Sequence, residues 1–158
     1  MIKLMNSEAL RDQIYAIALH TFEIVCFMYP LGEQEADENG LDEPDERVRS
    51  LVRFTGAREG AMIVTPSRQL RQSIASNMLG IEQADEEQEM GALKEISNIL
   101  CGNAAPLLAR NGTICSLKPP EIPNTEKDPA SEIDDNVTET IRIPFDEGWV
   151  EITVVFTK

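Results

Sequence analysis

The segment from Glu86 to Arg110 constrains the fold of this chain most, because its apolar residues recur with the period of an α-helix. Laid out at about 100° per residue, one set of mostly apolar side chains falls within roughly 60° of a single direction. That set is Leu93, Ile96, Ser97, Leu100, Ala104, Leu107 and Leu108. Asn111-Gly112 follows as a helix-ending pair. The sequence therefore predicts one long helix that packs this stripe into a core.

The opposite face of the same helix has an unusual composition for a surface that meets only water. Gly91, Glu95, Asn98 and Gly102 fall together within an arc of about 60°. Glycine inside a helix costs roughly 1 kcal/mol relative to alanine, and its lack of a side chain lets a partner approach closely. Glu95 and Asn98 lie one turn apart, so a carboxylate and an amide can enter one small site on a partner together. The plain alternative is a hydrated face that happens to hold poor helix formers.

The rest of the chain alternates between helix-like and strand-like patterns. Residues 6–28 repeat apolar positions at helical spacing, and Pro30 is expected to stop that helix. Another helix is expected after Pro66-Ser67, with Gly80 at its end. The strand-like runs are 47–55, 61–64, 113–117, 138–144 and 149–157.

These patterns predict one α+β domain that spans residues 1–158. Two of the strand pairs surround short glycine-containing turns, so the sheet is expected to be mostly antiparallel, with the helices packed on one face. Residues 31–46 are expected to form an acidic loop. Residues 123–136, rich in proline and acidic residues, are expected to form a mobile loop.

Charge and cysteine content exclude several classes of function. The net charge is −14, which repels phosphate backbones and anionic lipid, so we expect neither a nucleic-acid partner nor a membrane partner. No apolar run is long enough for a membrane span, and three scattered cysteines are typical of reduced thiols, so a cytoplasmic location is expected. His20 is the only histidine and has no cluster of ligands at metal-binding spacing, so no metal site is expected.

The chain resembles the CheC/CheX group of chemotaxis phosphatases, and more closely its CheX branch, which carries a single Glu-x-x-Asn motif. The residues that carry the resemblance are Glu95-Ile96-Ser97-Asn98-Ile99, then Gly102, then Leu117-Lys118-Pro119-Pro120. An earlier stretch from Phe54 to Gly80 also fits, so the resemblance covers roughly residues 10 to 122. It implies a pseudo-symmetric fold and, for the CheX branch, a homodimer.

The resemblance also implies an activity. Family members remove the phosphoryl group from the aspartyl phosphate of a CheY-like receiver protein. By this resemblance Asn98 would orient the attacking water and Glu95 would pair with a lysine of the receiver. Gly91 and Gly102 would give the receiver room to approach. The phosphatase would need no cofactor of its own, because Mg²⁺ is held by the receiver.

The chain departs from the family pattern at two positions, Gly91 and Pro120, and Pro120 comes one residue earlier than in the family, which a shortened loop could absorb. The family usually has aspartate or serine four residues before the glutamate, where this chain has Gly91, which keeps open the alternative of a binding module without catalysis. That module would dock a receiver or a motor-switch protein. Glu23 and Cys26 on the first helix align with Glu95 and Asn98, and a thiol cannot replace the amide, so we predict one active face rather than two.

Overall fold

The fold is described from a computed structural model that covers residues 7–31, 48–56, 59–108, 115–123 and 137–157. In chain order its helices and strands are α1 (Ser7–Cys26), β1 (Ser50–Thr55), β2 (Glu59–Pro66), α3 (Arg68–Leu79), α4 (Glu86–Leu108), β3 (Ser116–Leu117), β4 (Val137–Phe145) and β5 (Gly148–Thr157).

The strands form one antiparallel sheet in the order β3-β1-β2-β5-β4. β4 and β5 are a tight hairpin in which Phe145 pairs with Gly148, and Gly148 takes a φ of 146°, a conformation that glycine adopts easily. The centre of the sheet is the pairing of β2 with β5, where Val64 lies opposite Ile152. The sheet therefore joins two hairpins that are distant in the sequence.

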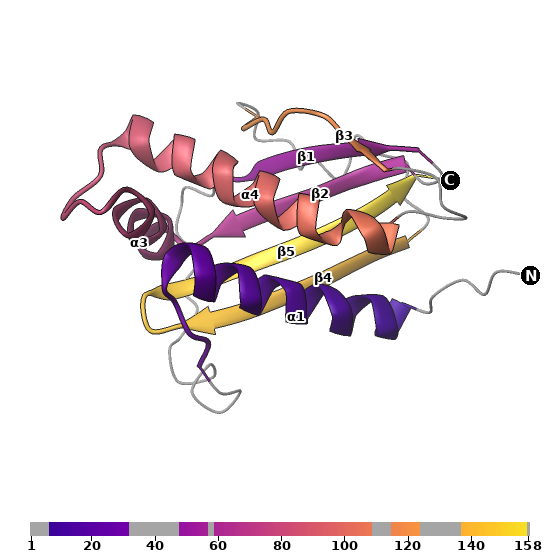
Figure 1. Cartoon of the computed structure of the whole chain (residues 1–158), viewed down its shortest axis with the longest axis horizontal. Coiled ribbons are helices and arrows are strands. Elements are labelled where there is room, and N and C mark those ends of the chain that lie inside the picture. The colour runs from indigo at the N-terminus through magenta and orange to yellow at the C-terminus, as the bar shows by residue number, and fades with distance from the viewer. Residues whose placement is uncertain (1–6, 32–47, 57–58, 109–114, 124–136, 158) are drawn as a thin grey trace, which may run out of the picture.

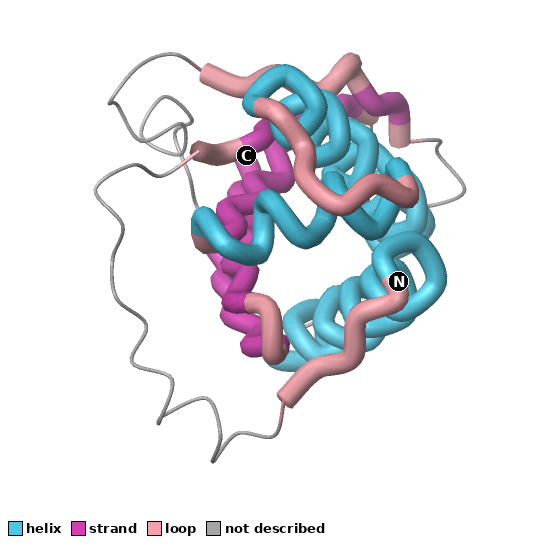
Figure 2. The backbone as a smooth tube through the Cα atoms, turned by 90° about the vertical axis from the view of Figure 1, so that its left-hand side faces the viewer, coloured by secondary structure: helices cyan, strands magenta, loops and turns pink. Residues whose placement is uncertain are grey.

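The helices lie on one face of the sheet, and the core fills the space between the two layers (Figures 1 and 2). The long helices α1 and α4 run antiparallel to each other across the strands (Figure 1). Aromatic side chains join the layers and the strands: the rings of Phe22 and Phe145 are 5.1 Å apart, and those of Phe54 and Phe156 are 5.9 Å apart. This arrangement confirms the predicted α+β class.

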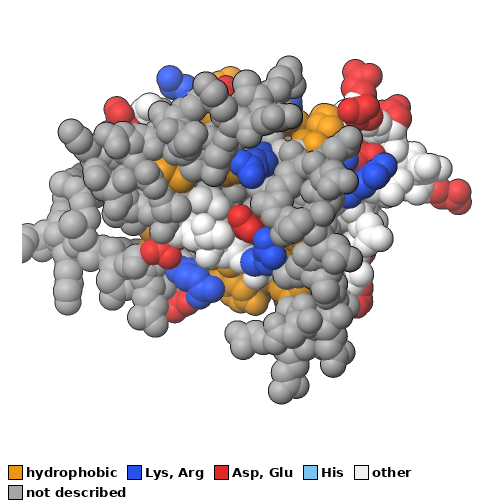
Figure 3. Space-filling model, turned by 180° about the vertical axis from the view of Figure 1, so that it is seen from behind, with side chains coloured by type: hydrophobic (Ala, Val, Ile, Leu, Met, Phe, Trp, Pro, Cys, Tyr) orange, Lys and Arg blue, Asp and Glu red, His pale blue; other side chains and the backbone are white. Residues whose placement is uncertain are grey.

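The opposite face of the sheet carries a small buried apolar cluster and paired charges. The cluster consists of Leu51, Ala61, Ile63 and Val155. Arg142 donates to Glu151 at 2.8 Å and lies 4.4 Å from the ring centre of Trp149. Figure 3 views the molecule from this side and shows basic and acidic side chains close to one another. On this part of the sheet, Arg142 is thus paired with a carboxylate of the neighbouring strand.

Helix ends agree with the sequence in two places and differ in one. Ser67 caps α3 by accepting a hydrogen bond from the Leu70 backbone N–H, and Gly80 ends the helix with a φ of 68°. The first helix was expected to reach residue 28 but ends at Cys26, because Phe27 turns into the left-handed region with a φ of 57°. The residues predicted to continue the long helix after Leu108, the predicted acidic loop from residue 32 and the predicted mobile loop from residue 124 lie outside the described residues.

Among the described residues, no helix combines the length and the apolarity that a membrane span requires.

Candidate functional site

Helix α4 starts with a reciprocal pair of hydrogen bonds that fixes its first turn. The Asp85 carboxylate accepts from the Gln88 backbone N–H at 2.8 Å, and the Gln88 side-chain oxygen accepts from the Asp85 N–H at 2.9 Å. Acidic residues in the first turn lie at the positive end of the helix dipole, where they are favourable. Glu89 also accepts from Arg71 of α3 at 3.0 Å. The start of α4 is therefore held in one position against α3.

The inner face of α4 is the stripe that the sequence predicted. The buried residues are Ala92, Leu93, Ile96, Ser97, Leu100, Cys101, Ala104 and Leu108. The only polar side chain among them, Ser97, donates to the Leu93 carbonyl oxygen at 2.7 Å, so its hydroxyl is satisfied within the helix. Leu107, which was predicted to be on this stripe, is partly buried against it. This packing sets the rotation of the helix and thus the direction of its other face.

The outer face brings together the four residues that the sequence singled out. Gly91, Glu95, Asn98 and Gly102 are all exposed. A Cβ atom added at Gly91 or at Gly102 would meet nothing within 4 Å. Neither glycine is therefore required by packing inside the chain, although each costs roughly 1 kcal/mol in a helix. Space above the helix backbone is the property that these two positions share.

Glu95 and Asn98 are available to a partner. Within the part of the chain that the structure describes, neither side chain hydrogen-bonds another residue. Glu95 offers a carboxylate to a cation, and Asn98 offers a carbonyl oxygen that accepts and an amide that donates. One helical turn separates them, so the β-carbons lie about 5–6 Å apart and both groups can reach the same small site.

The corresponding turn of α1 does not form a second copy of this face. Glu23 is exposed, but Cys26 is fully buried at the end of α1, whereas Asn98 is exposed. Burial, with a smaller contribution from the Glu147 carboxylate, raises the pKa of the Cys26 thiol to about 12. Cys26 therefore does not occupy an exposed position like that of Asn98: it is a core residue, because it lies one turn after Phe22 on the buried stripe of α1.

The other cysteines and the acidic residues offer no alternative chemistry in the described residues. Burial raises the pKa of the Cys101 thiol to about 12 and raises that of Cys115, which leaves little thiolate at neutral pH for nucleophilic attack. Among the described residues, no group of three or more His, Cys, Asp or Glu side chains is placed to hold a metal ion.

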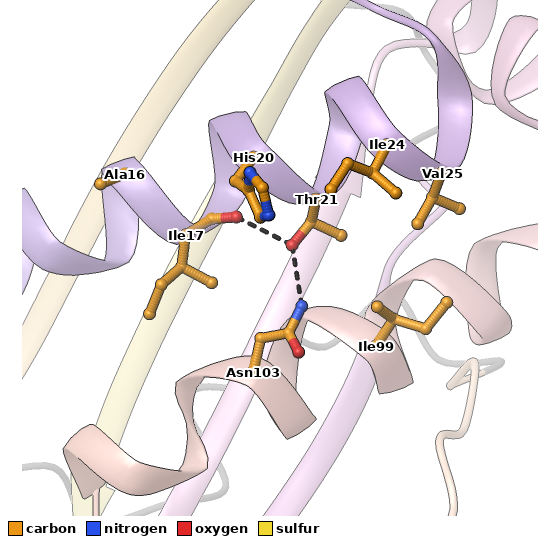
Figure 4. A pocket seen from close by; sticks show the side chains of 8 residues that line it. All are labelled: Ala16, Ile17, His20, Thr21, Ile24, Val25, Ile99 and Asn103. Atoms are coloured by element: carbon orange, nitrogen blue, oxygen red, sulfur yellow. Dashed lines mark hydrogen bonds between the residues drawn. The ribbon is translucent and has the colours of Figure 1, made fainter.

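The structure also shows a link between the long helices that the sequence analysis missed. The Asn103 side chain donates to the Thr21 hydroxyl at 3.1 Å, and that hydroxyl donates to the Ile17 carbonyl oxygen at 2.8 Å (Figure 4). These bonds lie in a groove of about 450 Å³ between α1 and α4. The groove is lined by Ala16, Ile17, His20, Thr21, Ile24, Val25, Ile99 and Asn103. In the sequence, Thr21 and Asn103 each lie next to the apolar stripe of their helix, which places both near the core. The sequence does not indicate that these two side chains hydrogen-bond each other.

A comparison with protein-family profiles matches the chain to the family described as chemotaxis phosphatase CheX over residues 48–145, more than half of the chain. The match includes β1, β2, α3, all of α4 and β4. Among curated proteins, none matches the chain at a significant level.

Solved structures share the fold at low sequence identity. The chemotaxis protein CheX from Vibrio vulnificus is 20% identical with a TM-score of 0.67, and the match covers 96% of this chain and 99% of that one. A CheX-CheY-BeF3-Mg²⁺ complex from Borrelia burgdorferi is matched at 19% identity and a TM-score of 0.64, covering 93% and 97%. A CheC-like superfamily protein from Shewanella sp. PV-4 is matched at 20% identity and a TM-score of 0.63, covering 98% and 100%. Because the family profile matches more than half of the chain and the fold is that of solved CheX structures, the chain belongs to the CheX family of chemotaxis phosphatases.

Proposed function

We propose that this protein removes the phosphoryl group from the aspartyl phosphate of a CheY-like receiver in chemotaxis or related two-component signalling. The observation that carries the proposal is the exposed face of α4, where Glu95 and Asn98 lie one turn apart between two glycines with open space above them. Membership of the CheX family supports it. A CheX protein in complex with CheY supports the class of partner.

Each side chain has a separate task in this proposal. The Asn98 carbonyl oxygen accepts a hydrogen bond from a water molecule and aims the water oxygen at phosphorus. The bond from phosphorus to the receiver's aspartate oxygen breaks, which gives inorganic phosphate and a free carboxylate. The Glu95 carboxylate binds a lysine of the receiver and so fixes the position of the phosphoryl group. Phosphoryl transfer depends mainly on positioning and on charge stabilisation, so one well-placed amide is sufficient to raise the rate.

The remaining parts of the proposal concern the assembly. The receiver supplies the Mg²⁺ that neutralises the phosphoryl oxygens, and this chain contributes no cofactor. Gly91 and Gly102 let the receiver backbone approach α4. We propose that the protein works in the cytoplasm, as a homodimer, with one active face on each copy.

The proposal is tested by changing Asn98 and Glu95 separately. We expect Asn98→Ala to lower kcat by about 100-fold or more with little effect on KM, because the amide acts on the water and contributes mainly in the transition state. We expect Glu95→Gln to raise KM, because it removes a charge that binds the receiver. The measurement is the release of inorganic phosphate from a receiver phosphorylated with acetyl phosphate.

Glu86→Gln is the matched control, since Glu86 is an exposed glutamate in the first turn of the same helix and about 120° away from Asn98 around it. It is expected to behave as wild type. Equal phosphate release by wild type and Asn98→Ala would overturn the proposed catalytic role.

A second candidate function is a binding module that docks a phosphorylated receiver, or a motor-switch protein, without hydrolysing phosphate. Gly91 favours it, because the family usually has an aspartate or serine there. The same experiment separates the two candidates. Receiver binding that survives Asn98→Ala, together with no turnover by either form, would select the binding module.

A further inference from the structure

The groove between α1 and α4 is a mostly apolar surface on a strongly acidic molecule. Apart from His20, its lining residues have no ionisable side chain, whereas the chain as a whole has a net charge of −14. Figure 4 shows Ile24 and Val25 on α1 facing Ile99 on α4, with the Asn103–Thr21 hydrogen bond between the helices beside them. Ile24 is 58% exposed and lies in the groove with Ile17, Val25 and Ile99, so its exposure is part of an apolar patch.

The groove adjoins the proposed active face through the backbone of α4. Ile99 follows Asn98, and Asn103 follows Gly102, so two consecutive turns of the helix contribute one residue to each surface. Successive residues on a helix point about 100° apart, so the two surfaces meet along the edge of α4 that faces α1. An interface of standard size takes about 800 Å² from each partner, which is enough area to include both Asn98 and this groove.

The charges also indicate what fills the groove. An aspartyl phosphate is anionic, and a net charge of −14 repels it at long range. Besides the local pairing of Glu95 with a receiver lysine, binding can draw on contacts that do not depend on charge, and the mostly apolar groove beside Asn98 offers them.

We propose that the groove between α1 and α4 binds an apolar side chain of the phosphorylated receiver, from a segment next to its phosphoaspartate. This inference rests on the proposed function. The side chain fits between Ile24 and Ile99 and ends over the Asn103–Thr21 hydrogen bond. Apolar binding in the groove and the charge of Glu95 both contribute to affinity, while Asn98 sets the rate.

A second copy of this chain is the competing occupant of the groove. It fits less well, because a copy seated between Ile24 and Ile99 would also cover Asn98 and block the receiver. A homodimer of an active enzyme therefore has to use another surface.

The test is to replace Ile24 by glutamine, which removes apolar surface without adding charge. We expect Ile24→Gln to raise KM for the phosphorylated receiver roughly tenfold, the change expected when a covered aliphatic side chain is lost from an interface. We expect kcat to stay within about twofold, because Ile24 does not touch the reacting atoms. Ile24→Leu is expected to restore KM. Binding of the receiver activated with BeF3 and Mg²⁺ should weaken by the same factor.

Tyr15→Gln is the matched control. Tyr15 is an exposed large residue on the same helix, and nine positions from Ile24 place it about 180° away, outside the groove. If Ile24→Gln keeps the wild-type KM while Asn98→Ala still loses turnover, the groove does not bind the receiver and the proposed function stands. Absence of turnover and of receiver binding by wild type would overturn both. A wild-type dimer that dissociates in Ile24→Gln during sedimentation, with KM unchanged, would assign the groove to a second copy.

Discussion

Phe27 is the residue whose backbone conformation fits its side chain least. It is the only residue other than glycine with a positive φ among those that the structure describes, and its ring is 68% exposed. Its N–H donates to the Glu23 carbonyl oxygen at 3.2 Å, and the next N–H reaches Phe22, so the residue ends α1 in the way that glycine usually does. A left-handed conformation costs a residue with a side chain about 1–2 kcal/mol.

Replacing Phe27 by glycine is expected to change the free energy of unfolding by less than about 1 kcal/mol. Relief of the left-handed strain is offset by the extra freedom that glycine gives the unfolded chain, roughly 0.5–1 kcal/mol. Urea denaturation measures the difference. Ala16→Gly is the control, since Ala16 is exposed in the middle of α1, where glycine is expected to cost about 1 kcal/mol. A loss of more than about 2 kcal/mol in Phe27→Gly would show that the ring packs on the chain.

At the scale of elements, the link between α3 and α4 is the most sensitive to a single change. Arg71 and Glu89 form a 3.0 Å ion pair whose side chains are only 9% and 15% exposed. The Nη1 atom of Arg71 is buried without a hydrogen-bond partner among the described residues, so the guanidinium depends heavily on this carboxylate. A buried cation without its partner is strongly destabilising.

Glu89→Gln is therefore expected to lower the free energy of unfolding by about 2–3 kcal/mol, slightly below the usual range for a fully buried pair, because both side chains retain some contact with water. Urea denaturation followed by circular dichroism measures the loss. Glu87→Gln changes an exposed glutamate in the same part of the helix and is expected to stay within about 0.5 kcal/mol of wild type. The double variant Arg71→Met with Glu89→Leu should be more stable than Glu89→Gln alone. The opposite order would show that the unpaired Arg71 cation is not the main source of the loss in Glu89→Gln.

The faces of single elements could be predicted from the sequence, whereas contacts between elements could not. The α4 stripe was found because burial follows the helical period, and the same count placed Glu95 and Asn98 outside. The hairpin of β4 and β5 was found because its strands alternate around a glycine turn. The pairing of Asn103 with Thr21 was missed, since local periodicity carries no information on which helices become neighbours. The alignment of Cys26 with Asn98 compares the two helices in sequence alone, whereas Cys26 lies on the buried stripe of α1.

At the scale of the whole molecule, one core between the helices and the sheet holds both long helices. Cys26 at the end of α1 and Cys101 in the middle of α4 are both fully buried in that core, although they lie on different elements. Access to either thiol therefore requires that the helix layer separates from the sheet.

Iodoacetamide is expected to modify Cys26 and Cys101 at the rate of global unfolding when the protein is kept native at pH 8. Their pKa of about 12 means that the folded thiols hold their protons there, and the thiolate is the reactive form. In urea the pKa returns toward 9.0, so both thiols should react quickly. Mass spectrometry of the labelled peptides measures the rates, and the partly exposed Cys115 serves as an internal reference. Fast native labelling of either buried cysteine, at the rate of Cys115, would contradict a single shared core.

The position of β5 between β2 and β4 also has a consequence for the chain while it is being synthesised. Pro66 and Val150 are paired at one end of the central ladder, yet more than 80 residues separate them in the sequence. At about 5–20 residues per second, a ribosome needs roughly 4–16 s to pass from one to the other. During that interval, the eight residues of β2 leave the backbone groups on one side of the strand unpaired. Binding of a chaperone to β2 protects the growing polypeptide best in this period.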